Sequence, residues 1–462
     1  MRQQTAISAG SVFVVYALVS YSVLQKVNST VKEPYMDEIF HVRQAQHYCK
    51  GDFDVWEPKL TTPPGLYLIS LVLNMSLTWI MGNKDMCTIE SLRITNWLLG
   101  LVLFWIIFGL VQQLHNTISI WQKVTSTLTL SLFPISFFFH HLYYTDTGSL
   151  LLVLLMYFFS LRQYHFAAGI TGFCALWLRQ TNVVWVGLVG FSAGISWFQN
   201  HRNIIRPKDS LSKSLLNINS WAIQQIGKCE DREILKVLIP YGIVIGVFGV
   251  FLISNGGIVL GDKAHHQAGM HVPQLFYFYA YMAAMTAPVI LPLIISRFWQ
   301  CGKLKPSNLV LGGLLAVVMT ISVSSFTMEH PFLLSDNRHY TFYLWKDIFQ
   351  RHWSIRYLAV PIYLISVCAV QHVIRPRVSA LWQLALALCT AAVLIPSPLL
   401  EFRYFTVPYF FTRLHMPLAE SRRALACELC MFVLINTITI WTFLNRPFEW
   451  DSEPGSLQRF MW

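Results

Sequence analysis

The chain has 462 residues, of which 55% are hydrophobic and only 12% are charged. A soluble protein carries about 25% charged residues, so this composition excludes an ordinary soluble enzyme and indicates a polytopic membrane protein. The formal charge of +11 comes from basic residues dispersed among the loops. Such dispersal is typical of cytosolic membrane anchoring and argues against nucleic-acid binding.

Long apolar runs predict an all-α polytopic membrane protein with about 12 transmembrane helices. The first run, residues 6–25, is interpreted as a retained signal anchor, because no convincing small-residue cleavage site follows it. We therefore expect a single integral membrane domain over residues 1–462. The remaining spans are expected at residues 93–112, 124–141, 148–161, 165–178, 183–198, 237–254, 274–296, 308–325, 356–373, 380–395 and 425–443.

A shorter apolar run at residues 66–81 decides how the loops are distributed between the two sides of the membrane. The segment 199–236 is rich in lysine and arginine, and the positive-inside rule places such a segment in the cytosol. That placement requires that the run 66–81 does not cross the membrane fully. We therefore predict an interfacial or re-entrant helix there, within a first lumenal loop of residues 26–92.

The same count puts both termini in the cytosol and two further loops, residues 326–355 and 396–424, in the lumen. Arg413, Arg422 and Arg423 then lie in or beside a lumenal loop, against the positive-inside rule. These arginines argue against the topology predicted for the carboxy-terminal third.

Unusual polar clusters all fall on the side that this topology makes lumenal. Polar groups at the membrane boundary are costly unless they are paired or solvated, so a shared functional cavity explains these clusters better than loop solvation. The clusters are Asp37-Glu38 with His41, residues 143–146, 179–182, 261–271, 329–340 and 401–404.

Asp37 and Glu38 are neighbours, so on a helix their side chains point about 100° apart. One of them can face a site as a general base while the other holds the loop. The alternative is that both carboxylates cap or solvate the start of a helix. The same alternatives apply to Asp146, which immediately precedes a predicted span.

The run from Asp336 to Tyr340 places Arg338 beside His339 at a predicted membrane edge. A guanidinium bonds oxygens in a bidentate manner and stays charged, so it suits a lipid phosphate. The alternative is an interfacial arginine that reaches toward the lipid headgroups.

The histidines and cysteines give no convincing metal-ligand set. His265, His266 and His271 lack carboxylate or cysteine partners, so loop histidines are the better interpretation and no metal is predicted. The C-x-x-C pair within the last span, Cys427 and Cys430, favours core packing over zinc for the same reason.

Two features of the first loop are left open by the sequence. Cys49 and Cys87 both face the lumen in this topology, where a disulfide is possible, but spacing does not decide it. Asn28 opens a glycosylation sequon that lies close to the membrane.

Several motifs together resemble one family over essentially the whole chain. It is the family of dolichyl-phosphate-glucose-dependent α-1,2-glucosyltransferases of lipid-linked oligosaccharide assembly, which belong to the GT-C class. The matching motifs are Tyr-Met-Asp-Glu-Ile-Phe-His at 35–41, Thr-Thr-Pro-Pro-Gly-Leu-Tyr at 61–67, Leu-Arg-Gln-Thr-Asn-Val at 178–183, Asp-Asn-Arg-His-Tyr-Thr-Phe-Tyr at 336–343, and Glu-Phe-Arg-Tyr at 401–404 with Pro-Tyr at 408–409.

The resemblance implies a GT-C glycosyltransferase fold in the endoplasmic reticulum membrane, with the active site facing the lumen. It implies dolichyl-phosphate-glucose as donor and the diglucosylated dolichol-diphosphate-linked oligosaccharide, the precursor of N-glycosylation, as acceptor. The donor is β-linked and the product α-linked, so the transfer inverts the anomeric centre. An inverting transfer needs one base and no covalent intermediate, and no cofactor is expected.

The resemblance and the polar clusters give the candidate site residues. Asp37 and Glu38 are the catalytic candidates, with Asp37 favoured as the base. The substrate-binding candidates are His41, Asp146, Arg179, Asp336, Arg338, His339 and Arg403.

Three rival hypotheses remain. The first is a GT-C mannosyltransferase that uses dolichyl-phosphate-mannose, and the second is a polytopic secondary transporter. Transporters place polar residues near the middle of the membrane, whereas the clusters here lie at one face. The third is a non-enzymatic membrane partner such as a channel modulator, which does not predict a dense acidic cluster.

Overall fold

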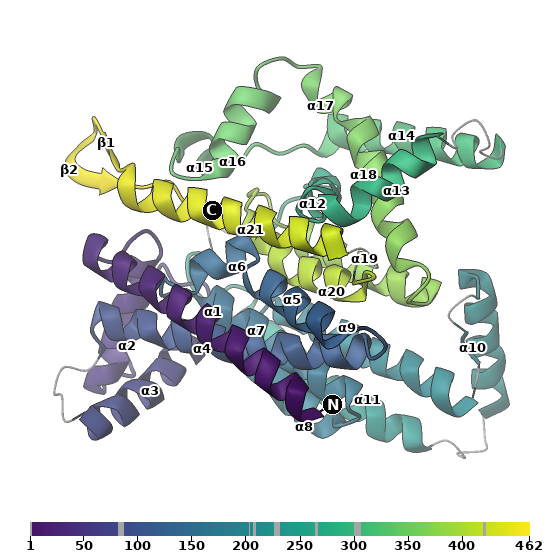
Figure 1. The fold of residues 1–462 in the computed structure, drawn as a ribbon, viewed down its shortest axis with the longest axis horizontal. Coiled ribbons are helices and arrows are strands. Elements are labelled where there is room, and N and C mark those ends of the chain that lie inside the picture. The colour runs from purple at the N-terminus through teal and green to yellow at the C-terminus, as the bar shows by residue number, and fades with distance from the viewer. Residues whose placement is uncertain are drawn as a thin grey trace. The chain divides into compact units, whose positions relative to one another are not determined.

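The computed structural model describes residues 2–81, 87–202, 204–206, 209–225, 232–263, 267–299, 306–418 and 422–462. Figure 1 shows a chain that is built almost entirely of helices. The chain divides into two compact units. Unit 1 comprises residues 1–205 and 216–267, and unit 2 comprises residues 206–215 and 268–462.

Unit 1 is a bundle in which α4 packs against α1, α5 and α7, while α7, α8, α9 and α11 pack against one another. The helix α10 (Leu211–Gln225) begins in unit 2 and ends in unit 1. The other elements are α1 (Arg2–Thr30), α2 (Glu38–Lys50), α3 (Gly65–Met81), α4 (Ile89–Leu114), α5 (Ile120–Ser131), α6 (Pro134–Phe139), α7 (Thr145–Leu161), α8 (His165–Leu176), α9 (Asn182–Trp197), η1 (Phe198–Arg202) and α11 (Arg232–Asn255).

Unit 2 is organised around α12, which packs against α14, α18 and α19. It ends in a two-stranded antiparallel hairpin. The prediction of an all-α fold is therefore wrong for this part of the chain. Its elements are α12 (Pro273–Met285), α13 (Ala287–Trp299), α14 (Pro306–Phe326), α15 (Pro331–Ser335), α16 (Tyr340–Tyr343), η3 (Leu344–Phe349), α17 (Ile355–Leu358), α18 (Val360–Ile374), α19 (Ala380–Leu394), η4 (Phe402–Phe405), α20 (Thr406–His415), α21 (Arg422–Asn445), β1 (Phe448–Trp450) and β2 (Glu453–Gln458).

Apolar helices make the chain a multi-pass membrane protein. Among the described residues, six helices are long and apolar enough to cross a bilayer. They are Ile7–Thr30, Ile89–Leu114, Glu233–Asn255, Leu309–Phe326, Ile355–Ile374 and Arg422–Asn445. Shorter apolar helices occur at Gly65–Ser76, Thr145–Leu161, His165–Leu176 and Ala380–Leu394. The predicted count of about 12 crossings therefore stays a prediction.

Two of the predicted spans are broken helices. The span expected at 124–141 ends at Ser131 and resumes at Pro134, because proline has no N–H for a helical hydrogen bond and restricts the residue before it. The span expected at 274–296 is interrupted at Thr286, two residues before another proline, Pro288.

The cysteine pair in α21 was wrongly predicted to pack in a core. Cys427 and Cys430 are both exposed and free on the surface of this apolar helix. Their neighbours Leu425 and Glu428 occupy the buried face instead.

The end of α1 and the start of α4, which flank α3 in the chain, are in contact within unit 1. Arg93, in the first turns of α4, bonds the carbonyl oxygen of Val31 directly after α1, at 2.7 Å. The end of α1 and the start of α4 therefore lie on the same side, although α3 lies between them in the chain. The predicted interfacial or re-entrant placement of 66–81 requires this arrangement.

The C-terminal tail, residues 446–462, packs on the segment that contains Arg338. The N–H of Met461 donates to the carbonyl oxygen of Arg338 at 2.9 Å, and the N–H of Tyr340 donates to the carbonyl oxygen of Met461 at 3.3 Å. The tail and this segment therefore share one side of the membrane. The prediction placed the loop 326–355 in the lumen and the tail in the cytosol, and these two placements cannot both hold.

The helix α20 explains this error. It has ten residues, too few to be recognised as a span from apolar length. It nevertheless packs against α19 and returns along it, since His415 at its end contacts Trp382 near the start of α19, with ring centroids 4.2 Å apart. If α20 is counted as a return, Arg422 and Arg423 lie opposite the loop 326–355. That is the side on which the positive-inside rule expects arginines if this loop is lumenal.

Candidate functional site

Glu38 is a fully buried anchor at the start of α2. Arg93 binds both of its carboxylate oxygens, from Nε at 2.9 Å and from Nη2 at 2.7 Å. The backbone N–H groups of Tyr35 and Tyr143 donate to the same carboxylate at 3.0 and 2.7 Å. Four hydrogen bonds hold the carboxylate of Glu38, which the sequence analysis named as a catalytic candidate, in one orientation.

Arg93 ties together the segments around this anchor. Besides Glu38 and Val31, it contacts the side-chain oxygen of Asn28 at 3.3 Å. Sequence analysis missed Arg93, and the available signal was a charge inside an apolar helix. Asn28 is buried in the last turn of α1 and is held by this contact, so the sequon is not presented as a surface loop for glycosylation.

Asp37 occupies the turn that leads into α2. Its backbone N–H donates to the Tyr144 hydroxyl at 3.1 Å, and that hydroxyl donates to the carbonyl oxygen of Tyr35 at 3.3 Å. Met36 has φ of 57°, a conformation that is uncommon for non-glycine residues. In the described helix α2, the Asp37 side chain makes no capping hydrogen bond. Asp37 therefore occupies the N-cap position of α2, as the alternative interpretation expected, but its side chain does not cap the helix.

His41, in the first turn of α2, packs beside the turn that contains Asp37. It is 7% exposed, and its Nδ1 shares a hydrogen bond of 2.7 Å with the Tyr67 hydroxyl at the start of α3. Its ring also approaches that of Tyr144, with centroids 5.9 Å apart. His41 therefore joins α2 to α3 and to the tyrosine that holds Asp37.

The Pro-Pro-Gly motif docks on the segment between α8 and α9. The N–H of Gly65 donates to the carbonyl oxygen of Trp177 at 2.8 Å. A Cβ atom at Gly65 would collide with that same oxygen, so this position requires glycine. Gln180 completes the junction by donating from Nε2 to the carbonyl oxygen of Thr61 at 2.7 Å. Two motifs far apart in the sequence thus meet in unit 1.

Asp146 and Arg179 form an ion pair beside the tyrosine that binds Asp37. Arg179 Nη2 lies 2.9 Å from Asp146 Oδ2, and Arg179 Nε donates to Thr145 Oγ1 at 3.1 Å. The N-cap residue of α7 is Tyr144, so Asp146 lies in the first turn rather than at the cap. Unit 1 therefore gathers Asp37, His41, Asp146 and Arg179 around Tyr144.

The remaining candidates lie in unit 2, where Arg338 is held from several directions. Asp336 accepts from its Nε and Nη2, each at 2.8 Å, and Gln458 accepts from its Nη1 at 3.1 Å. The guanidinium also lies over the Trp450 ring, 4.6 Å from its centroid. Burial opposes ionisation of Asp336, but the hydrogen bonds and charges of its neighbours, chiefly Arg338, outweigh burial and lower its pKa.

Trp462 brings the two arginine motifs of unit 2 together. His339 Nδ1 donates to the carbonyl oxygen of Trp462 at 3.0 Å. The Trp462 ring contacts Tyr340 and Phe402, with centroid distances of 5.2 and 6.0 Å. Phe402 adjoins Arg403, which forms an ion pair of 2.7 Å with Glu401. The sequence analysis did not predict that the tail contacts both arginine motifs. The aromatic residues of the tail were the feature that could have indicated it.

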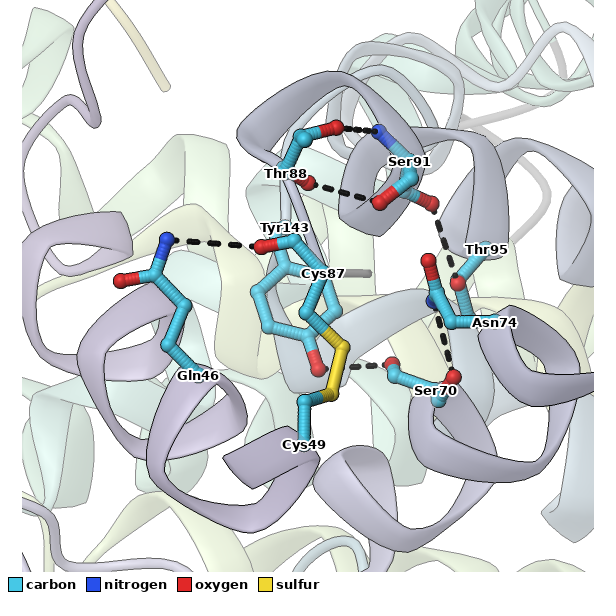
Figure 2. Close-up of a disulfide and its surroundings, with 9 residues drawn as sticks. All are labelled: Gln46, Cys49, Ser70, Asn74, Cys87, Thr88, Ser91, Thr95 and Tyr143. Atoms are coloured by element: carbon cyan, nitrogen blue, oxygen red, sulfur yellow. Dashed lines mark hydrogen bonds between the residues drawn. A yellow bond between two sulfur atoms is a disulfide. The ribbon is translucent and has the colours of Figure 1, made fainter. Parts of the chain in front are cut away.

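A disulfide closes the first loop. Cys49, near the end of α2, is bonded to Cys87, just before α4. Figure 2 shows it beside the hydrogen bond between Ser70 and Tyr143 hydroxyls, which is 2.7 Å long. The sequence left this pairing open, and the structure forms it.

We expect the variant Cys49→Ser to be less stable by about 4 kcal/mol, because a disulfide restricts the unfolded chain and this one closes a loop of 38 residues. Thermal unfolding of the purified protein measures the change. Cys174→Ser is the control, since Cys174 is free and exposed. Equal stability of the two variants would contradict the expectation.

A cavity of about 590 Å³ lies elsewhere in unit 1, and none of the candidate residues lines it. Its lining includes His165, Trp197, His201, Glu233 and Lys236. The candidate site therefore rests on the contacts around Asp37 rather than on this cavity.

No group of three or more histidine, cysteine, aspartate or glutamate side chains that could hold a metal occurs in the part of the chain that the structure describes. His265 and His266 lie outside the described residues. His271 bonds the carbonyl oxygen of Pro398 through Nδ1 at 3.2 Å, and burial lowers its pKa to about 4, so it is neutral at pH 7.

Comparison with known proteins finds relatives over nearly the full length. The family model described as the DIE2/ALG10 family matches residues 31–414. The Rattus norvegicus protein "Dol-P-Glc:Glc(2)Man(9)GlcNAc(2)-PP-Dol alpha-1,2-glucosyltransferase" is 36% identical over 463 residues, which cover 96% of each chain. Proteins of the same name from Arabidopsis thaliana and Drosophila melanogaster are each 34% identical, and the alignments cover 94% and 97% of this chain and 96% and 97% of theirs.

The solved structure of the Archaeoglobus fulgidus oligosaccharyltransferase also aligns with this chain. The alignment covers 87% of this chain and 53% of that chain, with 11% identity and a TM-score of 0.31. This score is too low to establish a shared fold.

Proposed function

Because this chain belongs to the DIE2/ALG10 family, we propose that it adds the terminal α-1,2-linked glucose to the dolichol-diphosphate-linked oligosaccharide from dolichyl-phosphate-glucose. The observation that carries the proposal is the 36% identity to a glucosyltransferase of that specificity, over 96% of both chains. The diglucosylated oligosaccharide is the acceptor. Both lipid-linked substrates are held in the lipid bilayer by their dolichol chains.

We place the activity at the lumenal face of the endoplasmic reticulum membrane, on a GT-C fold. The disulfide between Cys49 and Cys87 supports an oxidising compartment for the first loop, residues 26–92. The basic segment 199–236 supports the cytosol for the opposite face. In this scheme the loop 326–355 and residues 396–405 belong to the lumenal side, together with the C-terminal tail. The helix α20 then returns across the membrane, so the rest of the loop predicted at 396–424, with Arg422 and Arg423, faces the cytosol.

Asp37 is the general base of the proposed reaction. The acceptor hydroxyl oxygen attacks the anomeric carbon of the donor glucose, and its proton moves to the Asp37 carboxylate. The bond from that carbon to the phosphate oxygen breaks, and dolichyl phosphate leaves with the electron pair. A single base suffices for such an inverting displacement. Glu38 and Tyr144 support this role, because they fix the turn that carries Asp37.

The leaving phosphate requires positive charge, which the candidate arginines supply. Arg179, Arg338 and Arg403 are each held in a defined orientation by a neighbouring carboxylate. Guanidinium groups fit phosphate oxygens and stay charged, so they stabilise the charge that develops on the leaving group. We assign Arg338 and Arg403 to binding of the donor phosphate, and His339 to holding these arginines in place. We assign Arg179, Asp146 and His41 to binding of the sugar.

The rival hypotheses have less support. A mannosyltransferase would share the base and the arginines, but the relatives are named as glucosyltransferases. A transporter or a channel modulator would not need the buried anchor that orients Asp37. The donor sugar is therefore the property to test first.

Purified protein supplied with dolichyl-phosphate-glucose and a diglucosylated acceptor should form one new α-1,2-linked glucose, which linkage analysis of the product identifies. Dolichyl-phosphate-mannose should give no product, and an acceptor that lacks the second glucose should be a poor substrate. Transfer of mannose at an equal rate would contradict the proposal.

We also propose that the reaction needs no cofactor or metal ion, since arginines provide the positive charge that a divalent cation supplies in other phosphate sites. Activity should be unchanged after treatment with a strong chelator such as EDTA. The control is the same preparation with added Mg²⁺ or Mn²⁺. Loss of activity with the chelator and recovery with either ion would overturn the metal-free scheme.

A further inference from the structure

We propose that the C-terminal tail is a positioning element of the donor-phosphate site, in which Gln458 and Trp450 orient Arg338 and Trp462 couples it to Arg403. This inference rests on the proposed function for the identity of the ligand, a lipid-linked phosphate. The contacts that carry it lie wholly within unit 2.

The tail contacts Arg338 through two side chains, those of Gln458 and Trp450. Gln458 accepts a hydrogen bond from Nη1 at 3.1 Å and is 3% exposed, so this contact is shielded from water. Trp450 covers the flat face of the guanidinium at 4.6 Å, and its Nε1 donates to Asn337 Oδ1 at 2.7 Å. An arginine held at its edge and at its face presents its donors in a fixed direction, which bidentate recognition of an anion requires.

The tail is itself fixed rather than loose. Arg459 is 6% exposed and donates from Nη1 to the carbonyl oxygens of Phe443 and Leu444, at 2.9 and 3.0 Å. These carbonyls lie in the last turn of α21, so Arg459 caps the helix while it turns the chain back. The strands β1 and β2 then carry Trp450 and Gln458 to the same guanidinium.

Trp462 extends this support to the second arginine motif. Its carbonyl oxygen accepts a hydrogen bond from His339 Nδ1, and its ring contacts the rings of Tyr340 and Phe402. A shift of the tail would therefore move the neighbours of both Arg338 and Arg403.

The first test separates donor binding from folding. Gln458→Ala removes one charge-assisted hydrogen bond of Arg338, and Trp462→Ala removes the ring contacts with Tyr340 and Phe402. Each variant should raise the KM for dolichyl-phosphate-glucose about tenfold. The KM for the acceptor should stay at the wild-type value, and the thermal unfolding midpoint should change little. A merely structural role would instead lower the amount of active protein without this selective rise in donor KM.

Leu457→Ala is the matched control, because Leu457 lies in the same strand but its side chain is half exposed. It should leave both KM values unchanged. Wild-type donor KM in Gln458→Ala and Trp462→Ala, or an equal rise in the Leu457→Ala variant, would overturn the proposal. Neither outcome would affect the proposed function, which the wild-type protein tests by itself.

The second test does not depend on activity. Ser452→Cys places a thiol in the exposed hairpin turn, and Ser335→Cys places one in the exposed part of the loop 326–355. A membrane-impermeant maleimide should label both in the same membrane compartment, and label Ser212→Cys, in the basic segment, from the opposite side. The unmodified chain gives the background from its native cysteines. Labelling of Ser452→Cys and Ser335→Cys from opposite sides would overturn the proposal even if the kinetic variants failed to fold.

Discussion

Replacing Asp37 with asparagine is expected to reduce the rate of glucosyl transfer by a factor of about 10²–10⁴, the usual contribution of a general base. Asparagine has nearly the same shape but cannot accept the proton of the attacking hydroxyl. The backbone N–H of Asp37, which bonds Tyr144, is unchanged, so the turn keeps its conformation. The expected loss is therefore in kcat, with similar KM values for donor and acceptor, measured by product formation with the purified protein.

The matched control is Asp54→Asn, the same chemical change at an exposed position of the same loop. It should retain wild-type activity. Normal turnover in Asp37→Asn, with the protein folded and the control unaffected, would remove Asp37 as the base and leave another carboxylate to be found.

Replacing Arg93 with alanine is expected to lower the free energy of unfolding by about 3–5 kcal/mol, because it leaves the carboxylate of Glu38 buried without its charged partner. Both side chains of this ion pair are fully buried, so solvent does not compensate for the loss. Activity should fall as well, since the anchor that fixes the turn of Asp37 is gone. Unfolding of the purified variant in detergent, followed by heat or denaturant, measures the effect.

Two comparison variants test the cause of this loss. Lys236→Ala breaks an ion pair whose side chains are 72% and 69% exposed, and should change stability by less than about 1 kcal/mol. The double variant Glu38→Leu with Arg93→Met removes both charges and should recover much of the stability lost in Arg93→Ala. A double variant no more stable than Arg93→Ala would contradict burial of an unpaired charge as the cause.

Much of the fold could be predicted from apolar length alone, because a bilayer imposes a minimum on each spanning helix. The helices α1, α4, α11, α14 and α21 begin and end within a few residues of the predicted spans. Apolar length cannot recognise α20, whose ten residues are buried against protein instead of spanning lipid unaided. If this short helix is counted as a return across the membrane, the C-terminal tail lies on the side opposite to the one predicted.

The candidate site was predictable as a set of motifs but not as a set of roles. The sequence named both Asp37 and Glu38 as catalytic candidates and favoured Asp37, but it did not show that Glu38 is bound by Arg93, a residue 55 positions away in the chain. The same holds for Arg338, whose partners Trp450 and Gln458 follow the last predicted span. No local pattern encodes such pairings, because they depend on which helix ends meet in the folded protein.

The sequence distances of these contacts have a consequence for synthesis at the ribosome. The hydrogen bonds to the Glu38 carboxylate come from residues within 105 positions, so they can all form soon after Tyr143 has emerged. The contacts of Arg338 and His339 with Gln458 and Trp462 span 120 and 123 residues, so they form only after residues 458–462 have been translated. A nascent chain interrupted before those residues can form the bonds of Glu38 but lacks these partners of Arg338 and His339.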